Sequence, residues 1–384
     1  MRIRLWISLV ASCASACAAI QAQHTPLTEN QLVKLYNDFP PFPALDPASA
    51  SGNGDDKSFL RPLLIPRPPG SHNSTIVREF FTNHFKALPG WTVQEDRFTS
   101  PVPGPAELNF TNLIVQFSPN VTATRTKKQV RYLTLVAHYD SKFEPAGFIG
   151  ATDSAVPCGI LTYLAQALTP ALTKRWQKQQ QQQQQQQVNT NTTFSFIHSD
   201  EIGLQILFLD GEEAIAEWTP QDSLYGARHL AEAWDMDRMA TPRGRTSKIQ
   251  DIDLFVLLDL LGATAPSVPC YFGLTSWACK EMAAAEASAR TAGVTKFGQQ
   301  EEKQNDAPSF VRGNHLVENV FIDDDHMPFL RRGAPVLHVI PIPFPTQWHT
   351  MNDDADHLDP DAVHDWAVIV TTWVAGYLGL GEFV

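Results

Sequence analysis

The sequence predicts a single α/β domain with a mostly parallel, twisted central sheet and helices on both faces. Short apolar runs, with the length of strands buried on both faces, alternate along the chain with longer stretches of helical periodicity. Such alternation is typical of parallel strands joined by helical connections. No internal repeat and no second domain is evident. The apolar runs with this character are residues 132–137, 204–209, 252–258 and 335–340.

In the first part of the chain, the elements follow from periodicity. Residues 75–88 place apolar side chains at helical spacing, and residues 91–98 alternate between apolar and polar as a half-buried strand does. Pro, Asn and Ser are frequent in residues 24–66, which indicates an extended arm. The expected elements are helices at residues 28–36 and 75–88 and strands at residues 91–98, 113–117 and 132–137.

In the second part, the loop at residues 150–157 opens a predicted helix at 158–168. A glutamine tract at residues 177–187, broken only by Lys178, leads into residues rich in Asn and Thr. Because this composition cannot build a core, residues 177–193 are predicted to be a low-complexity surface insertion. The remaining expected elements are strands at 204–209, 252–258 and 335–340 and helices at 225–233, 277–291 and 362–378.

Composition and charge exclude several classes of partner. The chain has 384 residues, of which 43% are hydrophobic and 18% charged, so it can bury a sizeable core. Its formal net charge is −12. An acidic chain of this kind is not expected to bind nucleic acid or an anionic membrane surface.

The N-terminus has the pattern of a secretory signal peptide. Arg2 and Arg4 precede an apolar stretch at residues 5–20, and small residues follow. We expect cleavage after Ala22, with Ala18 as the alternative. The chain then divides into a signal peptide at residues 1–22, an N-terminal arm at 23–66 and the α/β domain at 67–384. No other stretch is expected to span a membrane, so the mature protein is predicted to be secreted without an anchor.

Sequons and cysteines are consistent with a secreted glycoprotein. Outside the signal, the cysteines are Cys158, Cys270 and Cys279, an odd number for an oxidising compartment. Cys270 and Cys279 are close enough in sequence to close a small loop and leave Cys158 free, but the sequence alone leaves the pairing open. The N-glycosylation sequons begin at Asn73, Asn109, Asn120 and Asn191.

Acidic and histidine side chains follow the predicted strands. Residues 210–213, Asp-Gly-Glu-Glu, place three carboxylates directly after a buried run, at the end of the strand where open α/β sheets bind their ligands. Taken alone, such a turn is as well explained by simple solvation as by function. Similar residues at other strand ends and loops shift the balance toward a metal site, and zinc suits this set of ligands. These residues are His138, Asp140, Asp153, Asp259 and His349.

Other hydrolytic and nucleotide-binding classes lack their motifs. The chain contains no glycine-rich phosphate loop, and the G-x-S-x-G turn of serine hydrolases with an α/β-hydrolase fold is absent.

At residues 65–380 the sequence resembles the glutaminyl-peptide cyclotransferases, the glutaminyl cyclases of animal and fungal secretory pathways. This family has the fold of secreted zinc aminopeptidases. The string WTPQDSLYG after the acidic turn is its most specific feature, since neighbouring aminopeptidases share the metal scaffold without that string. The strings that carry the resemblance are HYDSK (138–142), GATDSAVPCGI (150–160), LQILFLDGEEAIAEWTPQDSLYGARHLA (204–231), DLFVLLDLLGA (253–263), DDDHMPFLRRGAPVLH (323–338) and PFPTQWHTMNDD (343–354).

The resemblance implies a zinc-dependent acyltransferase that converts the N-terminal glutamine of peptides and proteins to pyroglutamate and releases ammonia. A single zinc would be held by Asp153, Glu213 and His349, with an open fourth position. Glu212 would be the general acid and base, beside a hydrogen-bonded pair, Asp259 and Asp324, that shares a proton. The chain is expected to act as a monomer. The substrate pocket would be lined by Trp218, Ile322, Phe344 and Trp348.

The sequence departs from the animal enzymes at two points. A cysteine usually precedes the histidine of the HYDS string and pairs with the cysteine that ends DSAVPC, but here Ala137 leaves Cys158 without that partner. Asp323 stands where the animal enzymes tend to carry Gln. The first change is expected to affect stability more than activity, and the second could shift the pH behaviour.

Two other functions compete with this interpretation. A secreted di-zinc aminopeptidase would use His138 and Asp259 for a second metal bridged by Asp153, with Glu212 activating water. Ser154 after the bridging position, and the bulky Trp348, weigh against such an open peptide cleft. A non-catalytic binding protein on a decayed scaffold would be expected to have lost a ligand or Glu212, and none is lost.

Overall fold

The structure is a computed structural model, and it places most of the chain. It describes residues 24–47, 58–104, 106–118, 130–189, 202–241, 244–264, 266–297, 309–317 and 320–384. The predicted signal peptide at 1–22, the sequons at Asn120 and Asn191, and residues 190–193 of the predicted insertion lie outside the described residues.

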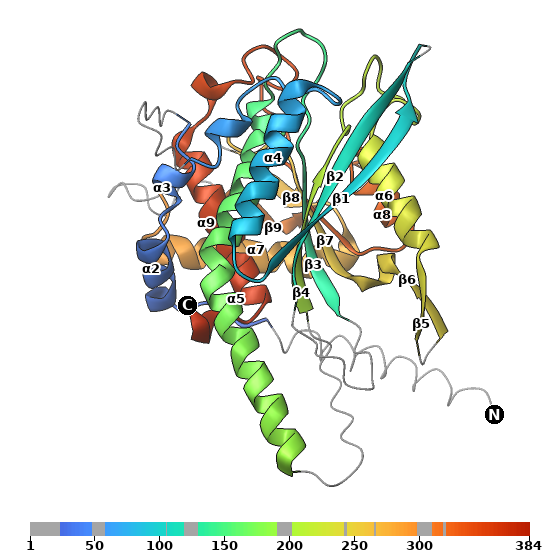
Figure 1. The fold of residues 1–384 in the computed structure, drawn as a ribbon. Coiled ribbons are helices and arrows are strands. Elements are labelled where there is room, and N and C mark those ends of the chain that lie inside the picture. Colours follow the sequence, from blue (N-terminus) through green and yellow to red (C-terminus); the bar gives the residue numbers. More distant parts are fainter. Residues whose placement is uncertain are drawn as a thin grey trace, which may run out of the picture.

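A central sheet of six strands, in the order β1-β2-β4-β3-β7-β10, organises the fold (Figure 1). Strands β4, β3, β7 and β10 pair in parallel, whereas β2 is antiparallel to both β1 and β4. Since β2 alone runs the other way, the prediction of a mostly parallel sheet is confirmed, with an antiparallel edge. The strands are β1 Trp91–Pro101, β2 Glu107–Phe117, β3 Arg131–His138, β4 Ile202–Leu209, β7 Ile252–Leu258 and β10 Val336–Val339.

Strand β4 is almost continuously apolar because both of its faces are buried. Ile206 and Phe208 belong to the core on one face of the sheet, and Leu207 and Leu209 belong to the core on the other face. The polar exception is Gln205, whose Oε1 accepts a hydrogen bond from the Thr134 hydroxyl on β3 at 3.1 Å. The buried amide is therefore satisfied across the sheet, as a polar group in a core must be.

Helices cover both faces of the sheet, as predicted. The larger apolar core lies between the sheet and α2, α4, α5, α7 and α9, and the smaller core lies under α6 and the short α8 (Figure 1). The predicted helices were found close to their expected bounds, apart from α5. The helices are α2 Glu29–Asp38, α3 Pro41–Ala44, α4 His72–Ala87, α5 Val156–Asn189, α6 Tyr225–Met236, α7 Ser276–Thr291, α8 Met327–Leu330 and α9 Pro360–Tyr377.

Side-chain caps fix where several helices begin. Thr28 forms a capping box with Gln31 at the start of α2, and Ser71 accepts the Ser74 N–H at the start of α4. Asp359 accepts the N–H groups of Asp361 and Ala362 just before α9. These caps satisfy backbone donors that a first helical turn leaves unpaired.

Helix α5 is much longer than the sequence suggested. It continues from the core through the glutamine tract to Asn189, so residues 177–189 of the predicted insertion are helical. Residues 151–181 are also long and apolar enough to cross a membrane, contrary to expectation, but 89% of their most apolar window is buried in the protein. This segment is a core helix by that measure.

Two small sheets were not predicted, because their strands are too short to show a periodic pattern. Strands β5 (Arg238–Thr241) and β6 (Gly244–Ser247) are antiparallel, and β8 (Val268–Cys270) and β9 (Val311–Leu316) are parallel. A disulfide joins Cys270 at the end of β8 to Cys279 in α7, and Cys158 is free and buried. The pairing considered from sequence spacing is therefore the one that forms.

Candidate active site

The parallel strands bring the predicted polar residues to one edge of the sheet. His138 ends β3, Glu212 and Glu213 follow β4, and Asp259 follows β7. Because these strands point the same way, their carboxyl ends meet at the same edge. Asp153 lies there too, in the irregular turn Ala151–Ala155 that precedes α5.

Three side chains converge as the predicted metal ligands. His349 Nε2 lies 3.3 Å from Asp153 Oδ2 and 3.5 Å from Glu213 Oε1. Both carboxylate oxygens are buried without a hydrogen bond. Tetrahedral zinc with ligand bonds of about 2.0–2.1 Å separates its ligand atoms by about 3.3–3.4 Å, which is close to the separations seen. This donor set therefore fits a zinc ion, and its atoms are not otherwise used.

Two further groups of metal-binding residue types also lie close together. His138 Nε2 lies 3.0 Å from Asp153 Oδ1 and 3.6 Å from Asp259 Oδ1, and Asp259 Oδ1 also accepts the Ser154 hydroxyl. These are the residues that a second zinc would need. In the other group, which includes His326, His338 Nε2 lies 2.8 Å from Asp324 Oδ2.

Glu212 is buried beside the metal-ligand triad. Burial and the nearby charges of Glu213, Asp324 and Asp325 raise its pKa well above the usual range of a glutamate, although His138 opposes the shift. General acid–base catalysts work best when their pKa lies near the working pH. The surroundings of Glu212 therefore suit the predicted acid–base role.

The pair expected from Asp259 and Asp324 is not joined by a hydrogen bond in this structure. Asp259 accepts from Ser154 and from the N–H of Leu260, while Asp324 contacts His338 and accepts the N–H of Asp325. The two carboxylates still influence one another, because burial and then the charge of Asp324 raise the pKa of Asp259 to about 6. Both of the hydrogen bonds that Asp259 accepts end on its Oδ1.

Without a metal, the carboxylates of the triad raise the pKa of its histidine, His349. Burial lowers the pKa of His349, but the adjacent carboxylates of Asp153 and Glu213 outweigh this and raise the pKa to about 9. A metal ligand must be deprotonated, so metal binding to this set would release a proton. Lys142 Nζ lies 3.1 Å from Glu213 Oε2 and partly neutralises the same cluster.

Aromatic side chains surround the histidine of the triad. Trp348 stacks on His349 with ring centroids 3.9 Å apart, and Phe344 meets Trp348 edge-on at 4.9 Å. The Trp348 and Trp218 side chains are 38% and 39% exposed, so both rings are accessible. Trp218 lies in the loop that follows Glu213, and Ile322, partly buried, lies just before Asp324.

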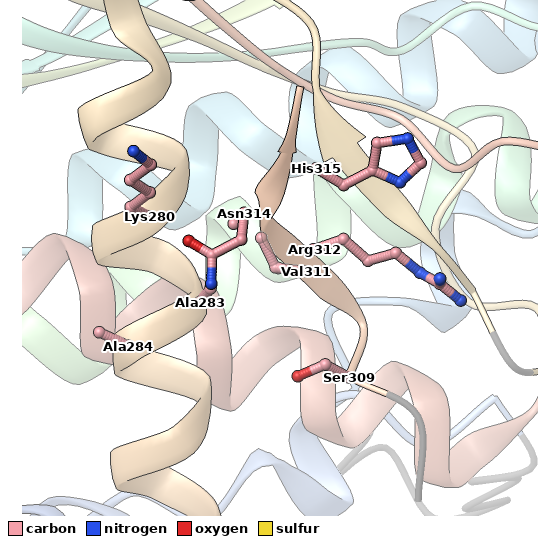
Figure 2. A pocket seen from close by; sticks show the side chains of 9 residues that line it. Lys280, Ala283, Ala284, Ser309, Val311, Arg312, Asn314 and His315 are labelled. Carbon is pink, nitrogen blue, oxygen red and sulfur yellow. The ribbon is translucent and has the colours of Figure 1, made fainter. Parts of the chain in front are cut away.

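A hollow elsewhere on the surface contains none of the predicted site residues. It measures about 570 Å³ and lies between α7 and β9, where Lys280, Arg312 and Asn314 are among its lining residues (Figure 2). The predicted ligands and carboxylates come from other parts of the fold, so this hollow is not the candidate active site.

Sequence analysis missed three buried charged residues around the ligands. Arg67 was not singled out, Asp140 was named only as one of the strand-end acids, and Asp353 lay only within a family string. The structure buries all three, with exposures of 1%, 0% and 2%. The available signal was that each is a charged residue in an otherwise apolar or loop sequence. Their hydrogen-bond partners are distant in the chain, so the sequence could not identify them.

The chain is similar to known proteins over most of its length. A profile of peptidase family M28 matches residues 120–374, a range that includes the triad. A glutaminyl-peptide cyclotransferase-like protein of Mus musculus is 41% identical over 328 residues, which cover 84% of this chain and 75% of that protein. The glutaminyl-peptide cyclotransferase of Drosophila melanogaster is 36% identical, covering 86% of this chain and 83% of its own.

A solved structure agrees with these sequence matches. The glutaminyl cyclase of Macrostomum lignano superposes with a TM-score of 0.67 at 31% identity, and the match covers 94% of this chain and 92% of the other. The similarity therefore spans the whole α/β domain.

Proposed function

The chain belongs to peptidase family M28 and, within it, to the glutaminyl-peptide cyclotransferases, and on this basis we propose the roles of its site residues. The enzyme is an acyltransferase that converts the N-terminal glutamine of peptides to pyroglutamate and releases ammonia. The observation that carries the assignment of roles is the triad of Asp153, Glu213 and His349, whose open ligand atoms lie at zinc-like separations.

We propose that this triad holds a single zinc ion. M28 is a zinc-dependent family, and the fit of the donor set supports the assignment. When bound, zinc supplies a Lewis acid that polarises the γ-carbonyl of the substrate glutamine and stabilises the oxyanion. The residues that a second zinc would need, His138, Asp153 and Asp259, also lie within reach of one ion, so the number of zinc ions per chain is decided by measurement.

Glu212 is proposed to move the proton. As the substrate's α-amino nitrogen forms a bond to the γ-amide carbon, Glu212 accepts a proton from that nitrogen. It then donates the proton to the amide nitrogen as the C–N bond breaks and ammonia leaves. Asp259 and Asp324 are proposed to keep the field around Glu212 negative, which favours its protonated form in the second half of the cycle.

The aromatic side chains are proposed to fold the substrate. Intramolecular attack requires the glutamine side chain to bend back on its own amine, and a pocket that enforces this conformation removes an entropic part of the barrier. Trp348 and Phe344 are in contact beside His349, and the exposed ring of Trp218 belongs to the loop after Glu213. With Ile322, these residues form the proposed substrate pocket.

Zinc content and ammonia release, measured on the purified mature protein with a Gln-initiated dipeptide, test the proposal. We expect one zinc per chain, ammonia release from the dipeptide, and at least about a 100-fold loss of turnover in Glu212→Gln with zinc retained. His349→Ala should lose the metal. Two zinc ions with release of a free N-terminal amino acid would instead identify an aminopeptidase.

We also infer that the enzyme acts in the secretory pathway as a glycosylated monomer without a membrane anchor. The signal-like residues 1–22 and the disulfide between Cys270 and Cys279 support this, because disulfides persist in oxidising compartments. Asn109, the first residue of one sequon, is exposed on β2. Secretion from a eukaryotic host, followed by N-terminal sequencing and a glycosidase mobility shift, checks each part separately, and size-exclusion chromatography with light scattering checks the monomer.

A further inference from the structure

Arg67 is a buried arginine with backbone carbonyls as its partners. Its Nε donates to the Tyr139 carbonyl at 2.6 Å, and its Nη2 donates to the Gly150 carbonyl at 3.1 Å. Nη1 also donates to the carbonyl of Ile149. Among the described residues no carboxylate lies within ion-pair distance of this guanidinium. The side chain therefore connects the segment after β3 to the segment that leads into Asp153.

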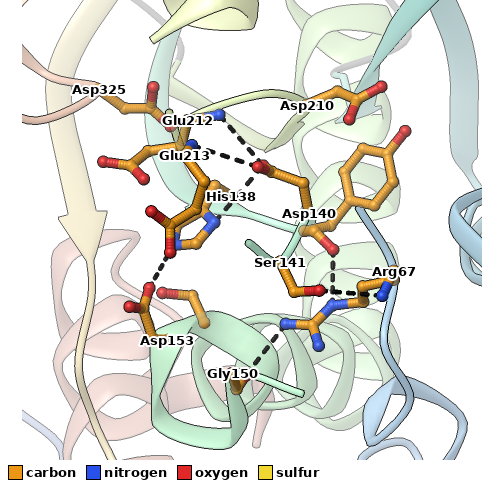
Figure 3. Close-up of polar contacts among 12 residues, drawn as sticks. Arg67, His138, Asp140, Ser141, Gly150, Asp153, Asp210, Glu212, Glu213 and Asp325 are labelled. Carbon is orange, nitrogen blue, oxygen red and sulfur yellow. Dashed lines mark hydrogen bonds and ion pairs between the residues drawn. The ribbon is translucent and has the colours of Figure 1, made fainter. Parts of the chain in front are cut away.

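Asp140 makes the corresponding connection to the acidic turn. Its Oδ1 accepts the N–H of Glu212 at 3.1 Å, and its Oδ2 accepts the N–H of Glu213 at 3.2 Å (Figure 3). Asp140 is fully buried, and the two residues whose N–H groups it accepts are buried with it. A single carboxylate thereby fixes the backbone of the proposed acid–base residue and of a proposed zinc ligand.

Asp353 makes the third connection, from the His349 segment to the Asp153 segment. Its Oδ1 accepts the N–H of Thr152 at 2.7 Å and the Thr152 hydroxyl at 2.9 Å. Its backbone carbonyl accepts the N–H of Ala151 at 3.0 Å. The two residues before Asp153 are thus tied to a residue that follows His349 closely in the chain.

We propose that Arg67, Asp140 and Asp353 are positioning residues that together set the distances between the three metal-ligating atoms. None of the three is a ligand in the proposed zinc site. Each joins two segments that are far apart in sequence, and between them they connect the segments of Asp153, Glu213 and His349 to one another. The inference rests on the proposed zinc site and extends it to residues with no assigned role.

Charge explains why apolar packing could not serve here. Backbone N–H groups and carbonyls left unpaired in a buried turn are costly, and a charged partner forms stronger hydrogen bonds with them than a neutral one. The guanidinium reaches several carbonyls in one plane, which a lysine ammonium cannot do. Outer residues that orient metal ligands commonly change metal affinity by about 10–100-fold when replaced.

Asp140→Asn is the first test, because it keeps the shape and removes the charge and one acceptor. Asp365→Asn is its matched control: Asp365 is also buried, and it accepts the N–H groups of Lys296 and Phe297 at 2.7 and 3.0 Å away from the site. We expect Asp140→Asn to weaken zinc affinity by about 10–100-fold, measured by competition with a chromophoric chelator. The control should lower the melting temperature of the metal-free protein while its zinc affinity stays within about two-fold of wild type.

Arg67→Lys is the second variant, in case Asp140→Asn does not fold. It too should weaken zinc affinity. The loss of affinity should be larger than any change in the melting temperature of the metal-free protein accounts for. Unchanged zinc affinity in a folded Asp140→Asn or Arg67→Lys variant would overturn the inference. In that outcome wild type and Asp365→Asn would still bind one zinc and release ammonia, whereas failure of the proposed function would show as absent zinc or absent ammonia in wild type itself.

Discussion

At the scale of single residues, the site shows how environment gives different roles to identical side chains. Glu213 faces His349 and Lys142, which stabilise its charged form, although burial still raises its pKa. Glu212 faces Asp324 and Asp325 instead, and its pKa is raised well above the usual range, with burial as the main cause. Adjacent glutamates therefore suit a ligand and a proton carrier respectively.

Gly150 combines a left-handed backbone conformation with a lack of space for a side chain. Its φ is +63°, and a Cβ at this position would lie 2.1 Å from the carbonyl oxygen of Asp153. We expect Gly150→Ala to lower the free energy of unfolding by at least about 2 kcal/mol, because it combines left-handed strain with a clash. Denaturant unfolding of the metal-free protein measures the loss, and zinc titration should show weaker binding. Substitution of Gly293, also left-handed but with no atom near its Cβ position, is the control.

His84 makes stability depend on pH. It packs against Phe59 and Phe85, its Nε2 is buried without a partner, and burial lowers its pKa to about 4. Because the folded-state pKa is below the unfolded value of about 6.5, the unfolded chain takes up a proton first, and stability falls as the pH drops from about 6.5 toward 4.

Replacing this histidine should remove its part of the acid sensitivity. Between about pH 7 and pH 4.5, the wild type should lose about 2 kcal/mol more stability than His84→Gln, after allowance for the partial exposure of the ring. Urea unfolding at both pH values measures each loss. Equal losses in the two proteins would show that His84 titrates normally in the folded state.

At the scale of elements, one carboxylate organises the loop between β4 and α6. Asp222 accepts the N–H groups of Ile215, Ala216 and Glu217, each at 2.9 Å, and the Tyr225 hydroxyl at 2.8 Å. The loop so formed carries Trp218 of the proposed substrate pocket. Its shape is therefore fixed locally, apart from the residues that hold the metal ligands.

Asp222→Asn should consequently affect substrate binding more than chemistry. We expect KM for a Gln-initiated dipeptide to rise by about ten-fold, the equivalent of one lost charge-assisted hydrogen bond, with kcat within about three-fold of wild type. Zinc affinity should not change. A fall in kcat at constant KM would contradict this, and would place the loop in the chemical step. Steady-state kinetics with zinc in excess separates these outcomes.

At the scale of the whole molecule, the site lies on a core that does not depend on it. The two apolar cores on either face of the sheet are built from strands and helices, while the triad lies on loops and turns at the sheet edge. This differs from small zinc domains, in which the metal replaces a core.

Removal of zinc should therefore lower stability without unfolding the protein. With free zinc at about 100 times its dissociation constant, binding contributes about 2.7 kcal/mol, and a chelator should remove this amount. We expect a lower melting temperature, unchanged far-ultraviolet circular dichroism at 25 °C, and full recovery of ammonia release on adding zinc back. Loss of helical signal on chelation at that temperature would show that the metal is part of the fold.

The sequence alone determined the elements whose residues interact locally or follow a strong period. The strands β3, β4 and β7 were predicted nearly to their bounds, because a strand buried on both faces must be apolar throughout. Helical periodicity placed α4, and the expected helices at 28–36 and 362–378 also lie close to the bounds of α2 and α9. The short strands β8 and β9 were not predicted, since their pairing depends on partners distant in the chain.

For the site, sequence identified the chemistry and the tertiary structure decided the geometry. Residue types and family strings pointed to Asp153, Glu213 and His349, because a metal site must draw on a small set of side chains. Which carboxylate oxygens stay open for a metal depends on contacts between segments far apart in the chain. Only the folded structure shows that Asp259 and Asp324 have other partners, and that Arg67 connects two of the segments around the metal site.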